Sequence, residues 1–496
     1  MKHLPRFAAL LLTLALLAGC TPGGDPAVTP TPAPSPTPAP TATAFALPYD
    51  PDGSLHPLAV TASANLSLMS LLYEGLFAVN TRFEAEPVLC QSALPNEDAT
   101  LWTLTVKPGV TCSDGTPVTG DLCRTSLLAA KASPLYAQRL QGISAITADG
   151  DRLAVSLSAP NRNLPALLDV PIFSGDKTPA GTGPYLLQET RLVARSDWWQ
   201  GLSLPLDTIA LVKAVSPEDL IYSFDAGDIA LVTGDLTGIN VLGYSGNYEV
   251  LDYPTSTMLY VGFNAAKGPC KSPALRSALT LGFDRATICG SLLAGHAVAS
   301  TLPVHPNADP LSGDSPLAYS LPELGKQLDA LGYLKGEDGL RRQKKSPLTL
   351  TMLVNTDSGF KTNVAEFLAD TLSREGVTVA LKKCSWEDYT ASLKRGDFDL
   401  YLGETRLTAD FDCAPLLAKN GALNYGGFSS PALEEALVLA KKTGDFAAFY
   451  PQLQTESPWS VLCFKNHSIL TRWGRVKDAT PTPGNIFYDF SHWTVR

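Results

Sequence analysis

The sequence predicts an α/β fold, because strand and helix patterns alternate along the chain and its composition is that of a globular protein. The clearest alternation lies in residues 348–402, where apolar strand-like runs are separated by stretches of helical periodicity. The chain has 496 residues, of which 45% are hydrophobic and 17% are charged. These proportions are ordinary for a globular protein, and the length predicts two to four domains.

The first 20 residues are predicted to be a lipoprotein signal peptide. A short positive start precedes an apolar run at 7–17, which is too short to span a membrane. The run ends in LAGC at 17–20, a quartet that resembles the lipobox of bacterial lipoproteins. Cleavage would leave Cys20 as the N-terminal residue, carrying the acyl chains. An ordinary secretory signal with a chance cysteine is the alternative.

Residues 21–45 are predicted to form a tether rich in proline, threonine and alanine. Alternating prolines favour extended polyproline II, at about 3.1 Å per residue, so the segment would reach about 75 Å. Such a stalk would hold a folded domain away from the membrane.

The elements after the tether are predicted from periodicity and capping residues. A helix-like apolar run at 68–77 is followed by a strand at 101–106, and Asp121 is a candidate N-cap for a helix at 122–132. The later predictions are strands at 153–157 and 258–263, a helix at 272–283, a strand at 348–354, a helix at 363–375, a strand at 377–381, a helix at 386–395 and a strand at 398–402.

Charge and motif spacing exclude several classes of function. The net charge of -10 argues against nucleic acid as a partner, since phosphate binding needs clustered cations. The six histidines form no HExxH and the nine cysteines no CxxC, so spacing predicts neither a metal site nor a cofactor. The cysteines other than Cys20 are expected to be mostly free thiols, although disulfides stay open.

An enzyme is also not predicted. SxxK at 358–361 and KTG at 442–444 are motifs of penicillin-recognising serine enzymes. The two lie too close together for that fold, and no SDN motif separates them. Gly444 in addition follows an apolar-periodic helix at 433–441, where glycine is a stop signal.

Several motifs follow one another in a recognisable order. They are LYEGLF at 72–77, VKPGVTCSDGTPVTGDL at 106–122, GTGPY at 181–185, SDWW at 196–199, and GFN at 262–264 with RSAL at 276–279 and FDR at 283–285. In this order they resemble the family 5 extracellular solute-binding proteins, which include the oligopeptide-, dipeptide- and nickel-binding components of ABC importers. Most of these motifs also have a plain reading as turns and corners that fix the fold.

The resemblance implies a two-lobed α/β fold of the type II periplasmic-binding-protein kind, with an extra subdomain in the first lobe. A ligand would be enclosed between the lobes by hinge closure. The implied first lobe covers 46–66, 171–262 and 466–496, its extra subdomain covers 67–170, and the second lobe covers 263–465.

The resemblance also implies a ligand site. Peptide-binding members hold the α-amine of the ligand with a carboxylate in an A-D-Y segment, and ADF at 409–411 is similar to it. A buried ammonium needs such a paired carboxylate. The candidate ligand-binding residues are Asp410, Trp386, Asn65, Arg406 and Glu404. Their alternatives are a loop carboxylate or helix cap for Asp410, core packing for Trp386 and surface exposure for Arg406.

Two departures from the family pattern indicate an altered pocket. Peptide binders often have a tryptophan three residues before the amine-binding aspartate, where this chain has Leu407. An extra residue also precedes Pro415. A peptide is therefore a weaker inference than a ligand of the family.

The predicted function is that of a lipid-anchored substrate-binding component of an ABC importer, on the extracytoplasmic face of the cell membrane. It would bind a peptide-like solute and deliver it unchanged to the permease and ATPase subunits, as a monomer without a cofactor. Two alternatives stay open: a binder of a metal chelate such as nickel or haem, and an orphan solute receptor.

Overall fold

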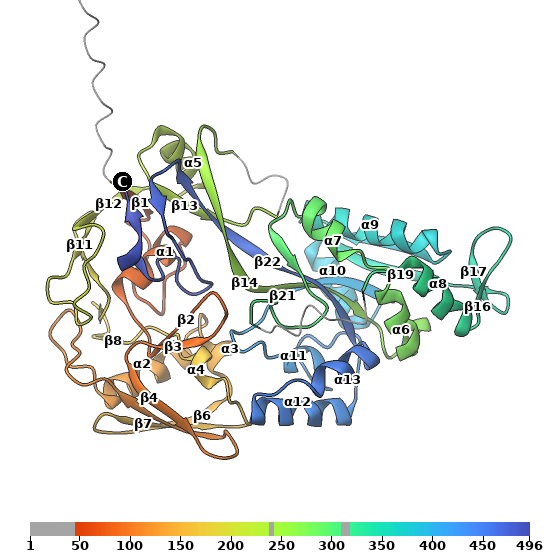
Figure 1. Ribbon diagram of the computed structural model, residues 1–496, viewed down its shortest axis with the longest axis horizontal. Coiled ribbons are helices and arrows are strands. Elements are labelled where there is room, and N and C mark those ends of the chain that lie inside the picture. The colour runs from red at the N-terminus through yellow and green to blue at the C-terminus, as the bar shows by residue number, and fades with distance from the viewer. Residues whose placement is uncertain (1–44, 238–242, 309–317) are drawn as a thin grey trace, which may run out of the picture. The chain divides into compact units, whose positions relative to one another are not determined.

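The computed structural model describes residues 45–237, 243–308 and 318–496. Cys20, the predicted signal peptide and all of the predicted tether except Phe45 lie outside these residues. In the described ranges, strands and helices are interleaved as predicted (Figure 1). None of the helices in these ranges is both long enough and apolar enough for a membrane span.

Two long strands connect the halves of a seven-stranded sheet. They are β14 (Tyr248–Phe263) and β22 (Trp459–Arg472), which pair antiparallel and run side by side (Figure 1). The strand order is β13-β22-β14-β21-β19-β20, with β15 (Ala297–Ala299) also on β22. The register of β14 on β22 shifts between Pro254 and Thr257, and β14 pairs with β21 (Leu400–Arg406) from Thr257 onward.

We call the part of the chain at the β13 end of this sheet the first lobe. Besides β13 (Leu231–Gly234), it has a four-stranded sheet in the order β1 (Ala46–Tyr49), β12 (Thr208–Lys213), β11 (Arg191–Ala194) and β10 (Tyr185–Gln188). Its helices are α1 (Ser63–Leu72) and α5 (Pro217–Ala226). Phe487, Phe490 and Trp493 from the C-terminal segment join its core, next to β23 (Val476–Lys477) and β24 (Thr494–Val495).

The extra subdomain has a hydrophobic core of its own. Its sheet has the order β4 (Cys90–Pro95), β5 (Leu101–Val106), β7 (Arg152–Leu157) and β6 (Ile143–Asp149). Its helices are α2 (Gly120–Ala132), α3 (Ala137–Leu140) and α4 (Leu164–Leu167). A hairpin of β2 (Phe77–Val79) and β3 (Ala85–Pro87) precedes it, and β8 (Phe173–Ser174) and β9 (Ala180–Gly181) follow it.

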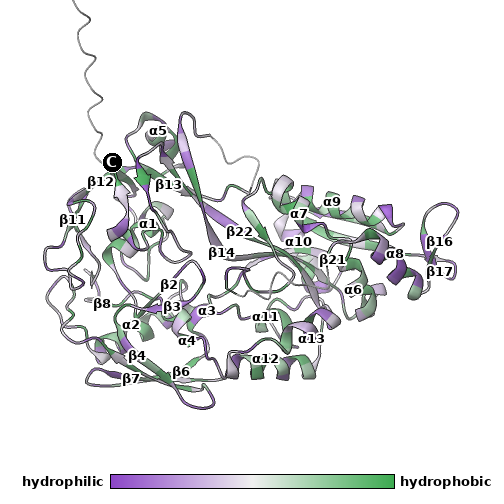
Figure 2. Cartoon of the chain, viewed as in Figure 1, coloured by the Kyte–Doolittle hydropathy of each residue, from purple (hydrophilic) through white to green (hydrophobic). Residues whose placement is uncertain are grey.

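The second lobe packs helices on both faces of β19 (Thr349–Asn355), β20 (Thr378–Cys384) and β21. One face carries α6 (Pro273–Thr280), α7 (Arg285–Thr287), α8 (Leu321–Ala330) and α9 (Gly359–Arg374). The other carries α10 (Trp386–Arg395), α11 (Ala414–Leu417), α12 (Pro431–Thr443) and α13 (Phe449–Glu456). Figure 2 shows hydrophobic and hydrophilic stretches along α9 and α12, as amphipathic covering helices require. The hairpin of β16 (Tyr333–Lys335) and β17 (Arg341–Gln343), which pairs with β18 (Ser346–Pro347), is mostly hydrophilic.

Three of the sequence motifs meet in the first lobe and hold it together. Glu74 of LYEGLF accepts hydrogen bonds from Trp199 Nε1 at 2.6 Å and from Gln200 Nε2 at 2.8 Å. A Cβ on Gly181 or Gly183 of GTGPY would lie only 2.3 Å and 2.5 Å from backbone atoms of Leu72, at the end of α1. These glycines allow a close backbone approach, so the motifs act in the fold, in agreement with their plain reading.

Some predicted elements differ from the observed ones at their ends. The helix expected at 68–77 is α1, which ends at Leu72: Tyr73 already has an extended backbone, and β2 begins at Phe77. Between them, a Cβ on Gly75 would lie 2.9 Å from the backbone of Val170. Thr119, and not Asp121, caps α2 by accepting from the backbone N–H of Leu122. The strand at 101–106 and the helix at 386–395 are confirmed as β5 and α10.

The predicted lobe boundaries remain a prediction. The partner change of β14 between Pro254 and Thr257 favours a first crossing before the predicted boundary at 262–263. The eight described cysteines are free, and all except Cys384 are buried.

Candidate functional site

Two cavities flank Asp410, in the loop that follows β21. The first has a volume of about 400 Å³ and lies between the subdomain segments 138–143 and 157–167 and the second-lobe segments 405–416. The second has a volume of about 550 Å³ and is lined by the β2–β3 hairpin, α4 and second-lobe segments near 409–413 and 444–450. Both volumes are in the range of small-molecule sites, and Asp410 lines both cavities.

The Asp410 carboxylate is buried but has only neutral hydrogen-bond donors. It is 9% exposed. Asn161 of the subdomain donates through Nδ2 to Oδ2 at 2.8 Å, and the Thr408 hydroxyl donates to Oδ1 at 2.5 Å. Burial raises the pKa of Asp410, while the charge of Lys441 and these two hydrogen bonds oppose the rise. Within the described ranges, Asp410 makes no ion pair.

The first cavity carries further charges. Lys441 and Asp412 neutralise each other, with Nζ and Oδ2 3.0 Å apart. Arg139 donates to the carbonyl of Asp169 at 2.6 Å, and Arg406 to the carbonyl of Pro483 at 3.3 Å. Neither guanidinium forms an ion pair within the ranges that the structure describes. Among the described residues, the cavity therefore combines one carboxylate and two guanidiniums that form no ion pair, with Lys441 close enough for its charge to act on Asp410.

The second cavity is lined by both aromatic and charged side chains. Its aromatic lining residues are Phe83, Phe411, Phe446, Phe449 and Tyr450. The rings suit hydrophobic groups, and the lining also carries charge besides Asp410, from Arg82, Glu84, Arg162 and Asp445.

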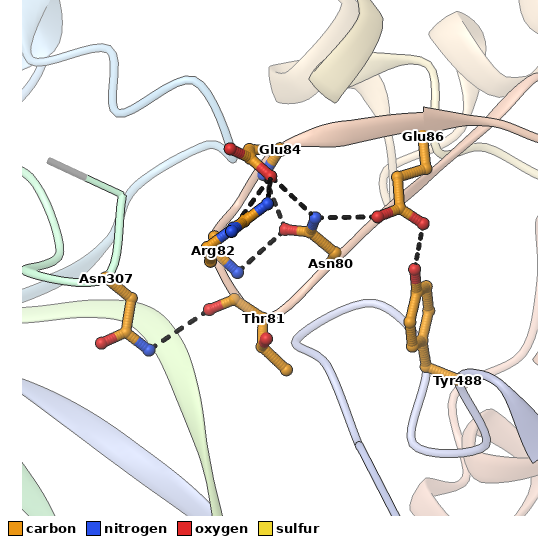
Figure 3. Close-up of polar contacts among 7 residues, drawn as sticks. All are labelled: Asn80, Thr81, Arg82, Glu84, Glu86, Asn307 and Tyr488. Atoms are coloured by element: carbon orange, nitrogen blue, oxygen red, sulfur yellow. Dashed lines mark hydrogen bonds and ion pairs between the residues drawn. The ribbon is translucent and has the colours of Figure 1, made fainter.

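A rigid hairpin turn forms one wall of the second cavity. Asn80 donates to Glu84 Oε2 at 3.0 Å and to Glu86 Oε1 at 2.9 Å, and Tyr488 donates to Glu86 (Figure 3). Asn307 of the second lobe donates to the Thr81 carbonyl at 3.2 Å (Figure 3). The turn is thus fixed from within and also bound to the second lobe.

Phe83, at the tip of this turn, inserts into aromatic residues of the second lobe. Its ring centroid lies 4.9 Å from that of Phe411 and 5.1 Å from that of His305. Phe83 and Phe411 both have positive φ, 62° and 53°, a conformation that costs energy in a non-glycine residue. Both residues of this contact therefore hold an unfavourable backbone conformation.

The structure brings one of the other candidate residues into a cavity with Asp410 and leaves the rest outside it. Arg406 lines the first cavity with Asp410. Glu404 lies on β21 and faces two cations, Lys361 at 3.1 Å and Lys465 at 3.5 Å. It lines neither cavity, and its role in ligand binding stays a prediction.

Trp386 and Asn65 lie away from both cavities. Trp386 is 59% exposed and stacks on Tyr389, with ring centroids 5.7 Å apart. Asn65 is fully buried, and its amide binds the backbone N–H and carbonyl of Asp50, each at 2.9 Å. The contacts of Asn65 are those of a residue that stabilises the fold. A ligand contact for Trp386 or Asn65 stays a prediction.

Sequence reasoning missed several polar residues of the first cavity, among them Arg139, Asn161 and Lys441. Arg139 lies on the short helix α3, Asn161 in a loop and Lys441 in the last turn of α12. None stands in a motif, and only the packing of the subdomain on the second lobe brings them together. No signal in the sequence alone pointed to them.

Known proteins resemble this chain along most of its length. Residues 84–416 match the family described as bacterial extracellular solute-binding proteins, family 5 Middle. The nickel-binding periplasmic protein of Escherichia coli is 23% identical over 84% of this chain and 85% of its own length. The periplasmic murein peptide-binding protein MppA of Escherichia coli is 22% identical over 86% and 88%.

Solved structures share the fold. The unliganded open form of MppA superimposes with a TM-score of 0.72, at 22% identity, covering 91% of this chain and 96% of the other. The oligopeptide-binding protein AppA from Bacillus subtilis, in complex with a nonapeptide, gives a TM-score of 0.59 at 18% identity, over 89% and 96%. The predicted two-lobed fold is thereby confirmed. The chain belongs to the bacterial extracellular solute-binding proteins of family 5, which bind solutes and are not enzymes, as its motifs predict.

Proposed function

We propose that this protein is the substrate-binding component of an ABC importer and that it binds a peptide-like solute in the first cavity. Family membership supports the general role. The names of two relatives, a murein peptide-binding and an oligopeptide-binding protein, favour a peptide-like solute.

The charge pattern of the first cavity carries the proposal. A buried carboxylate without a cationic partner is costly, and a ligand ammonium would offset that cost by pairing with Asp410. Arg139 and Arg406 can bind a carboxylate of the same ligand, since guanidinium and carboxylate match in geometry. An ammonium and a carboxylate on one small molecule describe an amino acid derivative or a short peptide.

We also propose that the protein lies on the extracytoplasmic face of the cell membrane, anchored through Cys20. The support is the sequence of the signal peptide and of the quartet at 17–20. Acyl chains on Cys20 would anchor the protein firmly, because each buried methylene contributes about 0.8 kcal/mol.

A metal chelate is the second candidate solute. The relative with 23% identity is a nickel-binding protein. A chelate of a metal with amino acids would also present carboxylates to Arg139 and Arg406. In the described ranges, no three histidine, cysteine or acidic side chains gather as a metal site, so such a metal would arrive with its own ligands.

Native mass spectrometry of protein purified without denaturation tests the proposal. We expect a bound species of peptide mass, and binding of members of a di- to tetrapeptide mixture by calorimetry after the species is removed. Metal analysis of the same sample separates the two candidates, because a chelate would add a stoichiometric metal. A protein without bound solute that also binds neither the peptide mixture nor nickel–histidine would contradict the proposal.

A further inference from the structure

The extra subdomain touches the second lobe beside Asp410 through residues that follow β7. Asn161 is fixed in the subdomain: its N–H donates to the Ala99 carbonyl at 2.9 Å, and its carbonyl accepts from Trp102 Nε1 at 3.1 Å. Its side-chain oxygen accepts from the N–H of Asn163 at 2.9 Å. The amide nitrogen that remains donates to Asp410. Asn161 therefore has one defined orientation, and its amide points at the Asp410 carboxylate.

The next residue, Arg162, caps a helix of the second lobe. Its backbone N–H donates to the carbonyl of Lys441 at 2.8 Å and its Nε to the carbonyl of Lys442 at 2.9 Å. These carbonyls belong to the last turn of α12, where a helix has no partners of its own for them. A guanidinium at this end also interacts favourably with the helix dipole.

The Arg162 side chain also packs closely against the turn that ends α12. α12 is followed by Gly444 with φ of 78°, a left-handed C-cap. A Cβ on Gly444 would lie 3.4 Å from Cδ of Arg162, so the Arg162 chain packs against this turn. A third contact, between Asp98 and Lys442 at 2.6 Å, joins more exposed side chains and is expected to contribute less.

We propose that Asn161 and Arg162 are positioning residues of the ligand site: Arg162 docks the subdomain on the end of α12, which places Asn161 to orient the Asp410 carboxylate for the ligand. This inference rests on the proposed function. A neutral donor such as Asn161 fixes a carboxylate without neutralising it, so the charge of Asp410 remains available to a ligand cation. A lysine or arginine at position 161 would instead pair with Asp410 and neutralise its charge.

The docking also explains why the site is complete only when subdomain and second lobe are together. Asn161 comes from one and Asp410 from the other, and the Arg162 contacts lie one residue away from Asn161. Opening the lobes would break the Asn161–Asp410 hydrogen bond and both Arg162 hydrogen bonds together. Ligand binding and closure are thereby coupled through these two side chains.

Hydrogen exchange on the full chain without ligand tests the docking step. We expect Arg162→Ala to raise amide exchange in segments 158–164 and 408–412. The control Arg124→Ala removes an arginine of α2 whose partner Asp121 lies three residues away, and it should leave these segments unchanged. Unchanged exchange in Arg162→Ala would overturn the docking role, whatever the solute is.

Calorimetry with the di- to tetrapeptide that the wild type binds most tightly tests the positioning step. Arg162→Ala and Asn161→Ala should each weaken its affinity at least about tenfold, the loss expected for a hydrogen bond to a charged group. Arg162→Lys, which keeps the charge, should recover part of the affinity. Wild-type affinity in both alanine variants would overturn the positioning role.

A pH profile separates positioning from a general structural effect. The hydrogen bond from Asn161 lowers the pKa of Asp410, so Asn161→Ala should shift the acid limit of peptide binding to higher pH. An unshifted acid limit would contradict the Asn161 contact as the orienting one. If the wild type binds no peptide, the proposed function fails, and the exchange experiment alone then decides the docking.

Discussion

Replacing Asp410 by asparagine tests the proposed site most directly. The change keeps size and shape but removes the charge. In the structure the carboxylate is 9% exposed and held by Asn161 at 2.8 Å and Thr408 at 2.5 Å. The amide oxygen can still accept from Asn161, and the Thr408 hydroxyl can turn to accept from the amide nitrogen. The local fold should therefore survive the substitution.

The expected loss of affinity follows from one charge-assisted bond. A hydrogen bond to a charged group contributes about 1.5–3 kcal/mol, and about 1.4 kcal/mol corresponds to tenfold in affinity. Asp410→Asn should therefore bind a peptide about 10- to 150-fold more weakly. Calorimetry at neutral pH measures this change, with the exposed Asp121→Asn as a control that should keep wild-type affinity.

Asp410→Asn is expected to lower the affinity for the peptide but not the free energy of unfolding. Burial raises the folded-state pKa of Asp410 above its unfolded value. The native state then binds more protons than the unfolded state between these two values, so stability falls as pH rises through that window. At neutral pH the ionised Asp410 is a net cost in the ligand-free protein. Asp410→Asn should therefore unfold in urea with an equal or higher free energy than the wild type.

These two measurements together decide the role of Asp410. Weaker binding with retained stability identifies a ligand-binding carboxylate. Unchanged affinity would remove Asp410 from the site, and a parallel loss of affinity and stability would make it a structural residue.

Three other predictions concern the core, the backbone and the anchor. Burial lowers the pKa of His305 to about 4, so the wild type should lose up to about 3 kcal/mol of unfolding free energy as pH falls from about 6.5 to 4. Urea unfolding of His305→Gln should lack this loss. An identical pH dependence in the variant and the wild type would refute the prediction. Gly183→Ala should lower the free energy of unfolding in urea by about 1–3 kcal/mol, because its Cβ would lie 2.5 Å from the Leu72 backbone. Gly359→Ala, with open space around it, is the control. Equal stability of the two variants would show that α1 can shift to make room for the Cβ. Cys20→Ser should move the protein from the membrane to the soluble fraction, and continued membrane retention would contradict the lipid anchor.

The sequence predicted the fold well because local patterns determine much of it. The alternation of β5 buries Trp102, Leu104 and Val106, and Gly396 ends α10 in the left-handed conformation, so these elements follow from short-range physics. The predicted end of α1 at residue 77 was wrong: the apolar run continues past Leu72, but the backbone is extended from Tyr73, and Gly75 approaches Val170, about a hundred residues away. Local signals carry no information on such contacts.

The candidate site could be predicted only in the segment where the sequence resembles a family motif. Asp410 and Arg406 lie in a segment with a family resemblance, and both line the first cavity. Arg139 and Asn161 stand in ordinary loop and helix sequence, and only tertiary packing brings them there. Trp386 and Asn65 matched family positions, but their surroundings here are solvent and backbone.

The burial of Asp410 connects binding to closure in energetic terms. When the subdomain covers the carboxylate, water is exchanged for two neutral donors, Asn161 and Thr408. Two such bonds do not fully replace the hydration of an ionised group, so closing over an empty site costs free energy. The Arg162 cap and the insertion of Phe83 favour closure and work against this cost. In the proposed site, an ammonium paired with Asp410 would remove this cost, and the solute would thereby shift the equilibrium to the closed state through its differential affinity for that state.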